Sequence, residues 1–255
     1  MTISDITETL EQTAPLILQE SYDNSGLLVG DAGAECTGAL LCVDATPERV
    51  REAAESGCNL LISHHPVIFR PLRRLTGETL PQRTVAEAIR LGVAVYACHT
   101  NLDNAPGGVS VEIATRLGLT DITPMMPGGT GAVGNLPTPL SASAFAELVK
   151  STLGSPVVRT NRFAPDRQIS RVALCGGSGS EFIPDAIRAG AQAYITSDTR
   201  YHDFVDYADT IFIVDTGHYE SEKCTTSIFQ RIITEKFPNF AVRISNTESN
   251  PINYM

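Results

Sequence analysis

The sequence has no apolar run long enough to cross a membrane. A spanning helix needs about 18 consecutive apolar residues, and no stretch of the chain reaches that length. The opening residues, MTISDITETLEQ, are acidic and lack both the basic start and the apolar run of a secretory leader. These absences predict a cytoplasmic protein that does not associate with membranes.

The chain also lacks paired cysteines and a surplus of positive charge. Its 6 cysteines are scattered without any C-x-x-C pair, and most lie in apolar stretches, which predicts reduced core residues. The formal net charge of −10 would repel a phosphate backbone, so general nucleic-acid binding is disfavoured. One basic segment, FRPLRRLTG at 69–77, is either a solvated loop or a contact for an anionic small molecule.

What the chain does contain is an internal repeat. Its 255 residues suffice for one large domain or two of ordinary size. ALLCVDATPERVREAAESGCNLLISHH and VALCGGSGSEFIPDAIRAGAQAYITSD align without gaps at an offset of 133, which pairs His64 with Ser197. Each segment predicts a strand, a helix, a glycine and a second strand. In the first copy Thr46 and Pro47 are typical of a helix start.

Each copy continues into another apolar strand that leads to a histidine. VAVYACH at 93–99 matches TIFIVDTGH at 210–218 at an offset of 119, so the first half carries 14 extra residues before this strand. A carboxylate follows each histidine four residues later, Asp103 after His99 and Glu222 after His218. Helix-like stretches come next in both copies, so the similarity spans nearly the whole chain.

The alternation of strands and helices predicts an α/β protein of two similar halves, each a small mixed sheet with packed helices. The stretch PMMPGGTGAVGNLPTP at 124–139 predicts the boundary between them. We expect a first repeat over 1–125 and a second over 126–255, whose C-terminal helix is free to pack on the first domain. Because a cleft between related halves is a natural ligand site, we expect the functional site there.

Five candidate metal ligands lie at the ends of predicted strands or just beyond them, where ligands collect in α/β sheets. They are His64, His65, Asp103, His218 and Glu222. Imidazoles and carboxylates suit a transition metal. A single catalytic zinc takes three or four protein ligands, so five candidates favour two divalent ions per chain. Zn, Mn, Fe, Co and Ni are not distinguishable on these grounds.

The histidine doublet requires a particular geometry. Adjacent residues on a regular strand point to opposite faces, so His64 and His65 reach a common centre only if the strand ends there. Pro66 favours that ending. We therefore predict one histidine per metal, with Asp103 and Glu222 shared between the ions. Two ions about 3.5–4 Å apart would hold a water or hydroxide as the nucleophile.

Two other histidines are the candidate catalytic residues. His99 either orients a ligand or donates a proton, and His202, in SDTRYHDF, either contacts substrate or is an ordinary loop residue. Asp44 and Asp198 are further acid candidates at strand ends. No residue can be assigned to substrate binding.

Two turn-rich segments leave alternatives open. SYDNSGLLVGD at 21–31 is either a functional loop or an Asx-type turn that leads into a strand over 27–29. GGSGSE at 176–181 precedes a helix, so its amides could meet a phosphate, but it matches neither G-x-x-x-x-G-K-[ST] nor G-x-G-x-x-G. It is therefore a weak nucleotide motif.

Five segments together resemble one known family. SYDNSGLLVGD, LLISHHPVIFRPLRRLTG, YACHTNLDNAPGGV, SDTRYHD and GHYESE occur in this order between residues 21 and 222, and they are similar to the GTP cyclohydrolase I type 2 homologs, the Nif-three-like family. The resemblance implies a two-domain α/β fold, a dinuclear metal centre on the same five ligands and a toroidal homohexamer. The chain resembles the short form without an inserted domain, and its SDTRYHD differs from the usual GDxKYHD at Ser197 and Arg200.

These observations predict a metal-dependent hydrolase in which metal-bound hydroxide attacks an electrophilic carbon or phosphorus. The family name implies hydrolytic opening of the GTP imidazole ring, so the expected partner is a small-molecule substrate such as a nucleotide. The alternatives are a metal-dependent phosphoesterase and a non-enzymatic metal-binding ring that acts as a metal carrier or a regulatory interaction scaffold.

Overall fold

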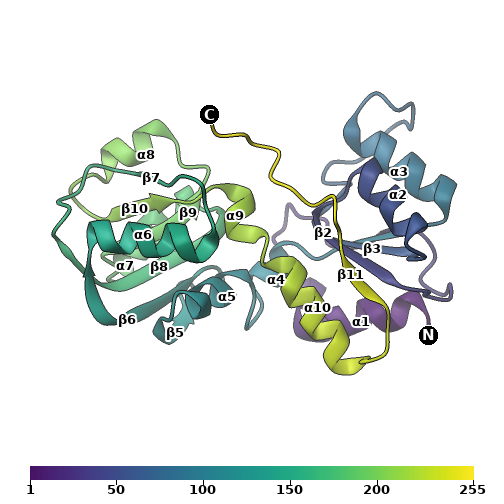
Figure 1. Cartoon of the computed structure of the whole chain (residues 1–255), viewed down its shortest axis with the longest axis horizontal. Coiled ribbons are helices and arrows are strands. Elements are labelled where there is room, and N and C mark those ends of the chain that lie inside the picture. The colour runs from purple at the N-terminus through teal and green to yellow at the C-terminus, as the bar shows by residue number, and fades with distance from the viewer. The chain divides into compact units, whose positions relative to one another are not determined.

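The computed structural model describes residues 1–255 as two compact units, shown in Figure 1. Unit 1 comprises Met1–Ala105 and Thr225–Ser249, and unit 2 comprises Pro106–Cys224 and Asn250–Met255. The boundary expected at 125 falls between two strands, β5 (Thr120–Pro124) and β6 (Ala132–Ser141), which pair in one sheet. The compact units therefore follow the sheets and not the Pro/Gly-rich stretch.

Unit 1 is built on a five-stranded sheet with the order β1-β4-β3-β2-β11. Its strands are β1 (Gly26–Val29), β2 (Ala39–Asp44), β3 (Leu60–His65), β4 (Ala94–Ala97) and β11 (Val242–Ile244). The edge strand β1 runs antiparallel to β4, and the other neighbours pair in parallel. β2 and β3 are buried at nearly every position, as expected for parallel strands covered on both faces.

Helices cover both faces of this sheet, α2 with α3 and α1 with α10 (Figure 1). The helices of unit 1 are α1 (Ile3–Thr13), η1 (Leu16–Leu18), α2 (Pro47–Glu55), α3 (Leu80–Leu91), α4 (Thr100–Asp103) and α10 (Thr225–Lys236). The Thr46 hydroxyl accepts the Arg49 N–H and caps α2. Gly92 ends α3 in the left-handed conformation, φ 66°. Leu40, Leu61 and Val50 belong to the buried core between α2, α3 and the sheet.

Unit 2 contains a six-stranded mixed sheet with the order β5-β6-β8-β9-β10-β7. Its further strands are β7 (Arg159–Thr160), β8 (Gln168–Ser178), β9 (Ala193–Ser197) and β10 (Phe212–Asp215). Its helices are α5 (Val109–Arg116), α6 (Ala142–Leu153), η2 (Ser180–Phe182), α7 (Ile183–Arg188), α8 (Tyr201–Asp206) and α9 (His218–Glu222). β8, β9 and β10 are parallel, whereas β5, β6 and β7 pair antiparallel. The prediction of a mixed α/β protein is confirmed.

The parallel strands that lead to the candidate ligands have related registers in the two units. Ala39 pairs with Leu60 in unit 1 and Val172 with Ala193 in unit 2, which reproduces the offset of 133. The next pairs are Leu60 with Ala94 and Ala193 with Phe212, so the third strands, at Ala94 and Phe212, are related by 118 residues. The histidines themselves differ by 119, so His218 lies one residue further beyond its strand than His99 does.

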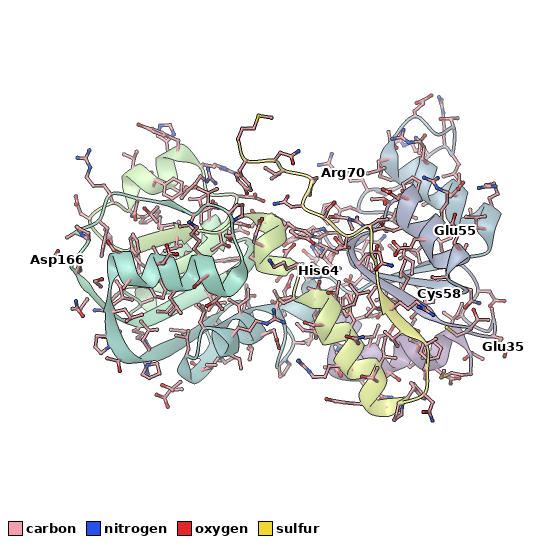
Figure 2. All side chains as sticks on the ribbon, viewed as in Figure 1. Glu35, Glu55, Cys58, His64, Arg70 and Asp166 are labelled. Carbon is pink, nitrogen blue, oxygen red and sulfur yellow. The ribbon has the colours of Figure 1, made fainter.

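The structure also bears on the cysteines, on the basic segment 69–77 and on membrane-spanning helices. All six cysteines are buried and free of disulfides, which confirms their prediction as reduced core residues. Arg70 is exposed on the loop between β3 and α3 (Figure 2). No helix combines the length and the apolar composition that crossing a bilayer requires.

Candidate metal centre

The histidine doublet stands at the carboxyl end of β3, as the sequence predicted. β4 pairs with β3 only as far as Ala97 opposite Ser63, so both histidines lie beyond the last pair on that side. His64, labelled in Figure 2, is fully buried and His65 is partly exposed. The two ring centroids are 5.1 Å apart. The end of the strand thus allows two adjacent imidazoles to face a common space.

His99 joins the doublet from the neighbouring strand. It follows β4 by two residues, and its ring centroid lies 5.2 Å from that of His64 and 5.5 Å from that of His65. Candidate ligand atoms of the three histidines all lie within 4.8 Å of one another. His99, considered from the sequence as an orienting or proton-transferring group, is therefore placed as closely as the two predicted ligands.

The hydrogen bonds of these rings determine which nitrogen faces a ligand. Four of the histidines, three in unit 1 and one in unit 2, each direct Nδ1 to an oxygen acceptor. The partners are the Cys98 carbonyl for His64 at 2.9 Å, and Asp44, Asp23 and Asp198 for His65, His99 and His218, each at 2.8 Å. Since these oxygens accept, the rings donate from Nδ1, and the neutral imidazoles carry their lone pair on Nε2. This is the usual arrangement of metal-binding histidines.

Asp23 is a functional candidate that the sequence indicated only as part of the turn-rich segment 21–31. Besides His99, its carboxylate accepts the Thr100 N–H at 3.0 Å, the Asn24 N–H at 2.7 Å and the Ser25 hydroxyl at 3.0 Å. Burial alone would raise the pKa of Asp23, but the hydrogen bonds from His99, Thr100 and Asn24 outweigh it and hold the pKa well below its usual range. The turn before β1 thus supplies a fixed negative charge to His99.

Asp103 faces the same group of histidines. It is the last residue of α4, and its N–H donates to the His99 carbonyl at 3.1 Å, which ties the helix to the end of β4. Its Oδ1 lies 3.8 Å from His64 Nε2, the nitrogen that carries the lone pair. Unit 1 therefore brings together three imidazoles and one carboxylate, the donor types that suit a transition metal.

In unit 2 the short helix α9 presents the second set of candidates. His218 and Glu222 are its first and last residues, so they lie on one face, with His218 Nε2 and Glu222 Oε2 2.9 Å apart. Glu222 is only 3% exposed. Asp198, which follows β9 and has φ 54°, holds the other ring nitrogen. A buried carboxylate beside an imidazole lone pair is a fitting pair of ligands for a divalent cation.

Gly177 makes room for Glu222. It belongs to GGSGSE, has φ +65°, and a Cβ built on it would collide with Glu222 Oε1. Its N–H donates to the Ser221 hydroxyl at 2.9 Å, which fixes the contact with α9. The glycine that the sequence associated with phosphate binding has a steric role toward a candidate ligand.

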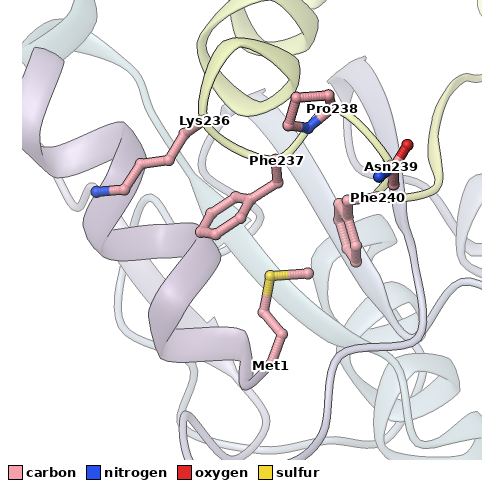
Figure 3. A pocket seen from close by; sticks show the side chains of 6 residues that line it. All are labelled: Met1, Lys236, Phe237, Pro238, Asn239 and Phe240. Carbon is pink, nitrogen blue, oxygen red and sulfur yellow. The ribbon is translucent and has the colours of Figure 1, made fainter.

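Two other features, one in each unit, do not belong to these sets. His202 is exposed on α8, with its ring 5.3 Å from that of Tyr201. In unit 1 a hollow of about 390 Å³ is lined by Met1, Lys236, Phe237, Pro238, Asn239 and Phe240 (Figure 3). None of the candidate ligands lines this hollow, so its size does not bear on the metal chemistry.

Comparison with known proteins gives consistent matches over the chain. A family model described as Duf34/NIF3 (NGG1p interacting factor 3) matches residues 1–251. A Clostridium perfringens protein named GTP cyclohydrolase 1 type 2 homolog is 36% identical over 231 residues, covering 87% of each chain. A Lactococcus lactis protein of the same name is 35% identical over 253 residues, covering 98% of this chain and 96% of that protein. A solved structure of a Staphylococcus aureus hypothetical protein has a TM-score of 0.92 at 27% identity and covers 100% of this chain and 99% of that one.

Proposed function

The chain belongs to the Duf34/NIF3 family, and we propose that it is a metal-dependent hydrolase with a dinuclear centre. The proposed ligands to the two divalent ions are His64, His65, Asp103, His218 and Glu222. The observation that carries the proposal is the orientation of the histidines, each of which binds an oxygen acceptor through Nδ1. Metal-binding histidines usually donate their other ring N–H to such an acceptor.

The donor set fits the ions. Imidazole nitrogens and carboxylate oxygens suit Zn, Mn, Fe, Co and Ni alike, and the buried Glu222 carboxylate would gain a cation to balance its charge. When bound, two such ions would supply Lewis acidity and lower the pKa of a coordinated water. Because His64 and Glu222 are buried, bulk water has little access to their side chains.

The proposed substrate is a nucleotide, with hydrolytic opening of the GTP imidazole ring as the leading reaction. This part rests on the relatives, which are named GTP cyclohydrolase 1 type 2 homologs. For proton transfer we propose His99, whose Nδ1 is held by the ionised Asp23 so that Nε2 can accept a proton and the imidazolium is stabilised. His202, exposed on α8, is proposed as a second proton-transferring group.

An internal repeat is also part of the proposal. The registers of β2 with β3 and of β8 with β9, related by 133 residues, support it. Each repeat would supply a histidine and a carboxylate four residues later, and we propose that the ligands of both form one centre. The family resemblance further suggests a homohexamer, which predicts a particle of six times the chain mass in light scattering.

The proposal is tested by metal content and turnover of the same preparations. The wild type is expected to hold about two ions per chain and to hydrolyse GTP. His64→Ala and Glu222→Ala are expected to lose metal and activity together, whereas His202→Ala should keep its metal and lose only turnover. Metal-loaded protein that hydrolyses neither GTP nor generic phosphoesters would contradict the enzyme and favour a metal-binding scaffold.

A further inference from the structure

A second buried carboxylate on α9 has no role in the proposed metal centre. Glu220 is 5% exposed, and its Oε1 accepts the Asn250 side-chain N–H at 2.7 Å. Its Oε2 is buried and has no hydrogen-bond partner. A buried charge that keeps one oxygen unsatisfied is costly, so this atom points to a missing donor.

The neighbouring carboxylate of Asp215 shows how unit 2 satisfies a structural acid. Asp215, 3% exposed, pairs with the Arg159 guanidinium and accepts the N–H groups of Thr199 at 2.9 Å and Gly217 at 3.1 Å. Burial of Asp215 is thus matched by three donors, whereas Glu220 has one. The hydrogen bonds of Asp215 are those of a structural carboxylate, whereas Glu220 lacks a donor for one of its oxygens.

Gly217 leaves room for the Glu220 carboxylate. This glycine has φ +86°, and a Cβ built on it would collide with Glu220 Oε2 and lie 3.0 Å from the Tyr254 hydroxyl oxygen. Burial, followed by the charges of Glu220 and Asp215, raises the pKa of Tyr254, so its hydroxyl stays protonated and can donate. The unfilled acceptor and a hydroxyl therefore both lie close to the same backbone position.

The cover over Glu220 is weakly held. Residues 251–255 are all exposed, with Ile252 at 53% and Tyr254 at 44%. The Asn250 amide binds Glu220 and its Oδ1 accepts the Ile252 N–H at 2.8 Å, which folds the segment over the carboxylate. The Asn250 amide gives the carboxylate one donor only, so a ligand that offers two donors can take its place.

We propose that Glu220 is the recognition residue of a subsite for a ligand with two adjacent N–H donors, and that residues 250–255 cover this subsite until the ligand replaces the Asn250 amide. The inference rests on the proposed function, which supplies a guanine nucleotide as that ligand. Guanine offers N1–H and the 2-amino group side by side, and a carboxylate accepts both. The Tyr254 hydroxyl would donate to an acceptor on the same base.

The test compares binding of GTP and ITP to metal-loaded protein by isothermal titration calorimetry. Hypoxanthine keeps N1–H but lacks the 2-amino group, so the wild type is expected to bind GTP about 10-fold or more tightly than ITP. Glu220→Gln should weaken GTP binding roughly 10- to 100-fold and bring the two affinities together. Glu181→Gln, an exposed glutamate of the same unit, is the matched control and should keep the preference.

A second variant protects the test against misfolding of Glu220→Gln. Asn250→Ala removes the competing amide and should tighten GTP binding about 10-fold or more, as expected for one hydrogen bond to a charged group. Three results would overturn the subsite: equal affinities for GTP and ITP in the wild type, no saturable binding of either nucleotide, or an unchanged preference in Glu220→Gln. In each case the partner of Glu220 would be an ordered water only. Metal content and turnover, measured alongside, fail only if the proposed function itself is wrong.

Discussion

The imidazoles of both candidate sets are oriented by oxygen acceptors that come from other parts of the chain. Asp44 ends β2 and holds His65, whereas Asp198 follows β9 and holds His218. Such partners fix the tautomer and the ring direction before any ion arrives. The orienting groups are therefore as informative about function as the candidate ligands.

Removal of the acceptor on His65 should weaken metal binding without removing a ligand. Asp44→Ala leaves the ring free to rotate and to exchange tautomers, so metal affinity is expected to fall about 10- to 100-fold. Asp44→Asn retains an oxygen acceptor and should have an intermediate affinity. Competition with a chelating dye measures both variants, and Glu55→Ala, an exposed charge of the same unit, is the control. Unchanged affinity in Asp44→Ala would exclude the orienting role.

Gly177 is expected to be more sensitive to substitution than a glycine with the same backbone geometry. Gly190 has φ +76°, and a Cβ added there would have no atom closer than 3.9 Å, so Gly190→Ala should cost only the left-handed backbone term, about 1–2 kcal/mol. Gly177→Ala adds the collision with Glu222 and should cost more, with loss of bound metal. Urea unfolding and metal analysis measure the two effects, and equal results for both variants would contradict the steric role.

At the scale of elements, the C-terminal segment after β11 is fastened to unit 1 through α2. Arg49 and Glu248 form an ion pair with side chains 7% and 9% exposed. Arg49 also donates to the Asp44 carbonyl at 2.7 Å, and Glu248 accepts the Val43 N–H at 2.9 Å. The segment therefore supports the end of β2, where Asp44 orients His65.

Glu52 gives this attachment a pH dependence. Its carboxylate accepts hydrogen bonds from Ser245, Asn246 and Thr247. Burial alone would raise the pKa of Glu52, but these hydrogen bonds outweigh it and lower the pKa. The unfolded state then binds more protons near pH 4.5, so the stabilisation is present above that pH and is lost as the pH falls through the lower folded-state pKa. Glu52→Gln should be less stable than the wild type by about 1 kcal/mol near neutral pH, and the gap should close in acid.

Urea titrations at several pH values measure this gap as a difference in free energy of unfolding. Glu55→Gln, on the exposed face of α2, should show no such gap at any pH. A gap for Glu52→Gln that is constant with pH would contradict the assignment.

Local patterns predicted the elements well, and pairing between distant segments was harder to foresee. β3 ends at His65 as the apolar run at 60–62 and Pro66 indicated, and α2 begins after Thr46 as its cap predicted. Asp23 was not assigned because its role depends on β1 pairing antiparallel with β4, which no local pattern encodes. The Pro/Gly-rich stretch at 124–139 predicted a boundary at 125, but β5 and β6 pair with each other across that position.

The proposed centre takes ligands from both units of the molecule, and this can be tested without knowing the substrate. His64→Ala removes a candidate from unit 1, and Glu222→Ala removes one from unit 2. If both serve one dinuclear centre, the loss of either disturbs the same ions, so the double variant should lose less metal affinity than the sum of the single losses, with a coupling of about 1 kcal/mol or more. Independent half-sites would give additive losses within about 0.5 kcal/mol. Dye competition measures all four proteins, and the pair His64→Ala with Glu181→Gln provides the additive reference. Additivity in the first pair would refute a shared centre while leaving each ligand set intact.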